Sequence, residues 1–131
     1  MSDEPELDIE KHIAYWREGA LECWKDVEHS LKGSRISLAM FSAHLAIEKA
    51  VKAHVVKNTM KHPPMIHNLL ALASLAGLDL SPQQRMLFAE LNPMNIEARY
   101  PGNIRKVLSE AEAESLARRT KVALEWLIKQ L

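Results

Sequence analysis

Residues 43–54 read AHLAIEKAVKAH, and this stretch lies inside a segment that is apolar on nearly every side of a helix. At 100° per residue, one face of the segment carries the apolar residues Ile36, Met40, Ala43, Ile47 and Ala50. The opposite side carries a second apolar set, Leu38, Phe41, Leu45 and Val56. A helix that is apolar all round is typical of a central helix covered by its neighbours. The sequence therefore predicts a central helix over about residues 35–58.

Three charged residues interrupt this helix, and Glu48, Lys49 and Lys52 fall within an arc of about 100°. One interpretation is a solvated patch where the helix emerges from its neighbours. A Glu48–Lys52 pair four residues apart would then stabilise the helix by only about 0.2–0.5 kcal/mol. The other interpretation is a charged pocket at the edge of the core, with the lysines directed at a phosphate or a partner carboxylate. Buried charges need such partners, because burying them alone is costly.

The segment before the central helix has a clear amphipathic pattern over about residues 7–31. Its apolar stripe is Ile9, Ile13, Trp16, Ala20, Cys23, Val27 and Leu31. Gly33 ends this helix, and we expect the Ser34 side chain to cap the start of the next one.

Further helices follow the KHPPM loop at residues 61–65. A short helix within residues 67–77 ends at a glycine, a position typical of a left-handed cap. Ser81 precedes a proline and opens the next helix. Ser109 and Glu112 have the spacing of a capping box and open the last helix. Its apolar stripe is Ala113, Leu116, Ala117, Thr120, Leu124, Leu127 and Leu131.

No stretch alternates with a period of two, so the fold class is all-α. We expect an antiparallel up-and-down bundle of four to five helices. The length of 131 residues predicts a single domain over 1–131, with residues 1–6 as a flexible N-terminus.

Composition limits the function classes. Seventeen basic and seventeen acidic residues balance, so any polyanion must bind to a local patch, and residues 52–62 (KAHVVKNTMKH) are the clustered candidate. The single Cys23 excludes a disulfide within the chain and a cysteine-based zinc site. His44 and Glu48 are too few to hold a metal, so we expect no metal and no other cofactor.

Without a signal peptide or a long apolar run, we expect a cytoplasmic protein with no membrane contact.

Three stretches together resemble the HEPN domain family: FSAHLAIEKAVKAHVV (41–56), IHNLLAL (66–72) and ARYP (98–101). In the central helix, the family frame of small residues around Glu-Lys and a second Lys is matched by Ala46, Glu48, Lys49, Ala50, Lys52 and Ala53. In the later motifs, the matching residues are His67, Leu69, Arg99, Tyr100 and Pro101. The resemblance extends from about Ile9 to Leu131, and it implies a HEPN-like helical bundle.

Two features depart from the family pattern. His44 stands where many relatives carry glutamine, which is a mild change. Ribonuclease members use an Arg and a His separated by four to six residues, and this chain has no such pair; Arg35 and His44 have eight residues between them. The family's ribonuclease chemistry is therefore not carried over, and we favour a protein that is not an enzyme.

The resemblance implies a binding module that is often a homodimer. Members of this branch are frequently paired with a minimal nucleotidyltransferase, sometimes as a toxin–antitoxin pair. The candidate site for a nucleotide, an RNA phosphate or that partner consists of Glu48, Lys49, Lys52, His67, Arg99 and Tyr100. Two alternatives stay open: a divergent ribonuclease toxin using His67 with Arg99, and a purely structural dimeric adaptor. Another open point is whether Arg99 contacts a ligand or forms a salt bridge to Glu48.

A possible protein interface lies on the last helix. Trp126 falls opposite the core stripe, one turn beyond Val122. An exposed tryptophan at this spacing indicates a homodimer or partner interface. The alternative is a larger bundle in which this side also packs inward.

Overall fold

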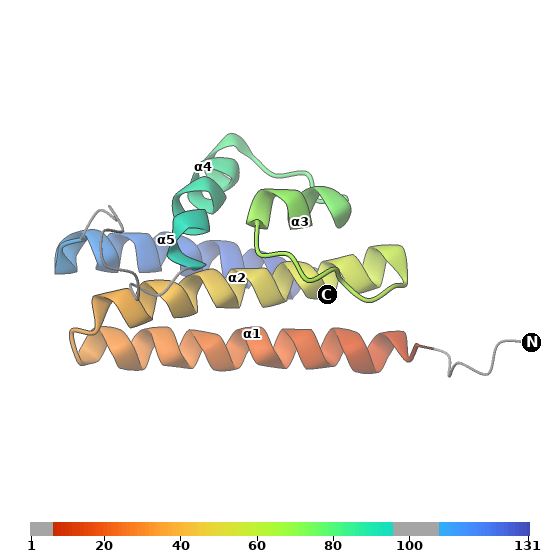
Figure 1. Cartoon of the computed structure of the whole chain (residues 1–131), viewed down its shortest axis with the longest axis horizontal. Helices are drawn as coiled ribbons and strands as arrows, with labels where there is room; N and C mark the ends of the chain where they lie inside the picture. The colour runs from red at the N-terminus through yellow and green to blue at the C-terminus, as the bar shows by residue number, and fades with distance from the viewer. Residues whose placement is uncertain (1–6, 96–107) are drawn as a thin grey trace, which may run out of the picture.

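The computed structural model describes residues 7–95 and 108–131, and this part of the chain is all-α, as predicted (Figure 1). Its elements are α1 (Ile9–Lys32), α2 (Ile36–Thr59), α3 (Leu69–Leu75), α4 (Pro82–Leu91), the 3-10 helix η1 (Asn92–Asn95) and α5 (Glu110–Lys129). No strand occurs among the described residues. The prediction of a flexible N-terminus at residues 1–6 lies outside them.

Helix α2 is the centre of the bundle. It contacts α1, α3, α4, η1 and α5, whereas α1 and α5 contact each other only slightly. The short link after α1 makes α1 and α2 antiparallel neighbours (Figure 1). Helix α5 runs parallel to α2, because α3 and α4 first carry the chain back across the bundle (Figure 1).

The core confirms the predicted central role of α2. Of its residues, fifteen are buried, and they cover every side of the helix from Ala39 to Val56. The predicted stripe of α5 is buried from Ala113 to Leu127 and packs against this helix. Nothing among the described helices is both long and apolar enough to cross a membrane.

Most helix ends follow the predicted chemistry. Both Ser81 and Ser109 form complete capping boxes, the first with Gln84 and the second with Glu112. Gly77 has a φ of +69°, the left-handed conformation expected of a residue that follows a helix.

The expected cap at Ser34 is wrong. Ser34 has a φ of 56°, and α2 starts after Arg35 without any side-chain cap. The Ser34 amide donates to the Leu31 carbonyl (3.0 Å) and the Arg35 amide to the Ser30 carbonyl (2.8 Å). These two bonds satisfy backbone carbonyl groups in the last turn of α1. Because they need a left-handed residue at position 34, Ser34 does not take the extended conformation of an N-cap.

Candidate functional site

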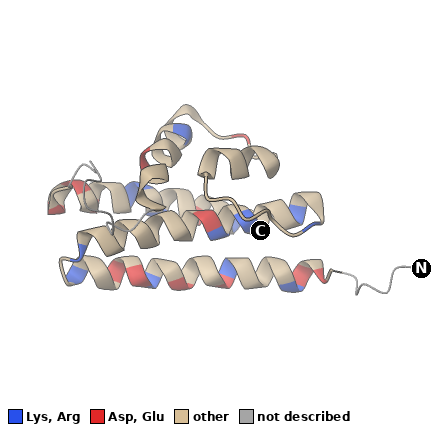
Figure 2. Cartoon of the chain, viewed as in Figure 1, with Lys and Arg blue, Asp and Glu red and all other residues tan. Residues whose placement is uncertain are grey.

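The charges in the middle of α2 form a buried pair. Glu48 is 3% exposed and Lys52 is 7% exposed, so the solvated-patch interpretation is wrong for these two residues. The Lys52 ammonium donates to Glu48 Oε2 at 3.1 Å, one helical turn away. The same ammonium lies 5.3 Å from the ring centroid of Trp16 on α1, close enough for a cation–π contact. Figure 2 shows how few charged positions α2 carries along its length, in contrast with α1.

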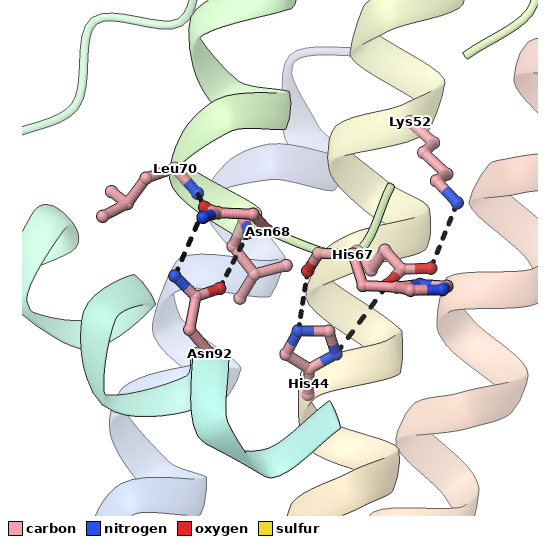
Figure 3. Close-up of polar contacts among 8 residues, drawn as sticks. His44, Lys52, His67, Asn68, Leu70 and Asn92 are labelled. Carbon is pink, nitrogen blue, oxygen red and sulfur yellow. Dashed lines mark hydrogen bonds and ion pairs between the residues drawn. The ribbon is translucent and has the colours of Figure 1, made fainter. Parts of the chain in front are cut away.

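The second carboxylate oxygen of Glu48 holds His67, which lies just before α3. His67 Nδ1 donates to Glu48 Oε1 at 2.9 Å, and the carbonyl of His67 accepts from His44 Nε2 at 3.0 Å (Figure 3). The two partners differ in accessibility, since the His67 side chain is 63% exposed and that of Glu48 is 4% exposed. We call Glu48, Lys52, His44 and His67 the charged cluster.

Within the charged cluster, His44 serves as a neutral donor. Burial lowers the pKa of His44, although the nearby Glu48 carboxylate works in the opposite direction. Its Nδ1 lies 3.9 Å from Glu48 Oε1, which is too long for a hydrogen bond. The negative charge of Glu48 is therefore balanced mainly by Lys52, and His44 fixes the backbone of the loop that carries His67.

The loop between α2 and α3 is fixed at both ends. Near its start, the rings of His62 and His12 meet edge to face with centroids 4.8 Å apart, which ties the loop to α1. At its end, Asn68 caps α3 by accepting from the amide of Leu70 (Figure 3) and from that of Ala71. His67 is consequently presented by a segment that is held in place on both sides, as binding groups generally require.

Lys49 does not join the charged cluster. Its side chain lies against α1, with its Cδ 3.1 Å from the position that a Cβ at Gly19 would take. It also contacts the thiol of Cys23, which is 5% exposed as expected for a buried cysteine. Burial raises the pKa of the Cys23 thiol, and the neighbouring Lys49 ammonium opposes that rise. Of the predicted site residues, the structure thus brings together Glu48, Lys52 and His67.

Arg99 and Tyr100 lie outside the described residues. The roles predicted for them, as ligand contacts or as a salt bridge to Glu48, stay predictions.

The basic segment at residues 52–62 is less open than its sequence suggests. Lys52 and His54 are buried, because α2 is covered on all sides along this stretch. The His54 Nε2 donates to the Leu127 carbonyl at 2.8 Å and so joins α2 to α5. Lys57, Lys61 and His62 remain exposed at the end of the helix.

The predicted interface on α5 is only partly open. Val122 is 69% exposed and borders a groove of about 400 Å³ between α4 and α5, which Met86 and Leu87 also line. Trp126 is half-buried and packs against the core, so its expected exposure is wrong. The reason is that α2 and its neighbours cover more of α5 than a single apolar stripe requires.

Two features of the site were missed in the sequence. His44 is a mild change in residue type, yet it bonds the loop backbone. Trp16 belongs to the predicted core stripe, yet it is half-buried beside Lys52, with the exposed Tyr15 ring against it. For the role of His44, the sequence offered one signal, namely its position one helical turn before Glu48.

Metal ligands do not gather in the part of the chain that the structure describes. No three His, Cys, Asp or Glu side chains lie close enough there to hold an ion.

With this geometry in hand, comparison with known proteins identifies the family. The profile of the HEPN domain matches residues 13–131. The chain belongs to the HEPN domain family. The crystal structure of an archaeal HEPN homologue has the same fold, with a TM-score of 0.69 and 18% sequence identity. The match covers 90% of this chain and 96% of the archaeal one. No protein with a curated functional description matches the sequence.

Family membership confirms the resemblance drawn from the three sequence motifs. As a HEPN domain, the chain still lacks an arginine followed by a histidine after four to six residues. Its most distinctive polar feature is instead the charged cluster.

Proposed function

We propose that this HEPN domain is a non-catalytic binding module that takes the phosphate of a nucleotide or RNA at His67. The observation that carries the proposal is an exposed imidazole whose Nδ1 is fixed by a buried carboxylate 2.9 Å away. With Nδ1 occupied, Nε2 is the nitrogen left for a ligand, and the imidazolium form donates from it to a phosphate oxygen. The buried Lys52 balances the charge of the Glu48 carboxylate, so the imidazole is oriented by an ion pair and not by an uncompensated negative charge.

The test is calorimetric titration of the whole chain with adenosine monophosphate and with inorganic phosphate. We expect His67→Ala to weaken binding at least tenfold, because it removes the contacting group. His29→Ala is the matched control, since His29 is an exposed histidine near the C-terminal end of α1. This variant should bind like the wild type. Absence of binding to the wild type at millimolar ligand, or equal binding by His67→Ala, would refute the proposal.

A second candidate, ribonuclease activity, is favoured by one observation. A carboxylate that orients an imidazole is the arrangement found in enzymes where histidine transfers protons. Incubation of single-stranded RNA with the wild type and with His67→Ala distinguishes the two functions. Cleavage that disappears in the variant would establish catalysis; intact RNA with retained binding would favour the binding module.

We also propose that the module is cytoplasmic and has two protein partners: a second copy of the chain and a minimal nucleotidyltransferase, as in a toxin–antitoxin-like pair. The exposed Val122 beside the α4–α5 groove supports a homodimer through this face. Light scattering after size exclusion should give the dimer mass for the wild type and the monomer mass for Val122→Glu. Co-expression with a nucleotidyltransferase encoded next to this gene tests the second partner, which is excluded if the two proteins elute separately.

A further inference from the structure

An aromatic pair on α1 lies next to the charged cluster. The rings of Tyr15 and Trp16 meet edge to face, with centroids 5.1 Å apart and planes at 80°. Trp16 is the side chain over which the Lys52 ammonium lies, at 5.3 Å. Since Lys52 is bonded to Glu48 and Glu48 to His67, a short chain of contacts joins the aromatic pair to the proposed phosphate position.

The aromatic pair is built differently from a core contact. Tyr15 is 66% exposed, so most of its ring surface is open to solvent. Trp16 is half-buried and contacts both Tyr15 and Lys52. A lone exposed tyrosine needs no explanation, but the ring of Tyr15 meets a half-buried tryptophan edge to face, and that tryptophan also contacts the Lys52 ammonium.

We infer that Tyr15, supported by Trp16, is a base-stacking subsite. This inference rests on the proposed function: the phosphate lies at His67, and the base of the same nucleotide stacks on the open face of Tyr15. Stacking requires a free face on the base, so the ligand class is an unpaired nucleotide, either a mononucleotide or single-stranded RNA. Every base has such a face, so the subsite accepts adenine and uracil alike.

The experiment compares two ligands that differ only in the base. The wild type is titrated with adenosine 5′-monophosphate and with ribose 5-phosphate, which keeps the sugar and phosphate. We expect the nucleotide to bind about 5- to 150-fold more tightly, the range measured for one stacked base. Tyr15→Ser should remove this difference by weakening the nucleotide alone. Because Tyr15 is exposed, the variant keeps the core, and circular dichroism verifies its fold.

The matched control is Leu21→Ser, which removes another exposed apolar side chain from the same helix, 43% exposed in the wild type. It should leave both affinities unchanged. Equal affinity of the wild type for the two ligands, or a preference for the nucleotide that survives in Tyr15→Ser, would overturn the subsite while the phosphate site stands. Failure of the wild type to bind either ligand would overturn the proposed function and the subsite together.

Discussion

Replacing Glu48 by glutamine tests the charged cluster most directly. The substitution keeps the shape of the side chain and an acceptor for His67, but it removes the charge that balances Lys52. The two side chains are only 4% and 8% exposed, so the ammonium would stay buried without its counter-charge. Removing one partner of such a pair costs about 3–5 kcal/mol. Out of a total of about 5–15 kcal/mol for a domain, this is a large loss, and it lowers Tm by about 10–20 °C.

The assay is equilibrium unfolding in guanidinium chloride, followed by circular dichroism, on the four members of a double-mutant cycle. Lys52→Met alone leaves Glu48 buried without its cation, whereas the double variant leaves no charge at either position. We therefore expect the double variant to lose less stability than the two single losses added together, with a coupling of about 1–3 kcal/mol.

The chain supplies a control for this cycle in the Glu22–Lys25 ion pair of α1. Its side chains are both 71% exposed, and its 3.0 Å bond is no longer than that of the buried pair. Glu22→Gln should change the free energy of unfolding by less than about 1 kcal/mol. If Glu48→Gln were as mild as Glu22→Gln, or if the losses in the cycle simply added, the buried charges would not depend on each other and the reasoning would be refuted.

Three further predictions concern stability. Burial lowers the pKa of His44 and His54, so as the pH falls through about 6.5 the unfolded chain takes up protons before the folded one. Urea unfolding should therefore show a lower free energy of unfolding at pH 5 than at pH 7.5, by up to about 1.4 kcal/mol per pH unit for each histidine. The His54→Gln variant should show a smaller dependence on pH. Gly77→Ala should cost about 1 kcal/mol in the same assay because of its positive φ, whereas Gly33→Ala, at a φ of −90°, should cost clearly less. Ser109→Ala removes the cap of α5 and should cost about 1 kcal/mol; an unchanged Tm would show that the cap contributes nothing.

The helices could be predicted because their signals are local. The capping box at Ser109 depends on residues three positions apart, and the central position of α2 follows from the distribution of apolar residues on its own surface. The prediction for Ser34 is wrong because backbone hydrogen bonds to the end of the preceding helix set its conformation. Any residue type can form such bonds, so the sequence carries no signal for them.

The site could be predicted only in part, because the burial of one side of a helix depends on which other segments of the chain cover that side. The sequence placed Glu48 and Lys52 on one side of a helix, but the groups that cover them, Trp16 and His67, come from other segments of the chain. Trp126 shows the same limit in reverse: the pattern of α5 alone indicated an exposed side, whereas neighbouring helices partly bury it.

The packing of α2 against α5, a helix that lies far along the chain, has a consequence for synthesis of the protein in the cell. The α1–α2 hairpin can form as soon as residue 60 has left the ribosome, but the apolar side of α2 that receives α5 stays uncovered until residues 110–129 have followed. During that interval the nascent protein exposes a hydrophobic surface, the condition under which aggregation competes with folding. The interval before α5 emerges, rather than formation of the first helices, is therefore the stage at which a chaperone would have most to offer.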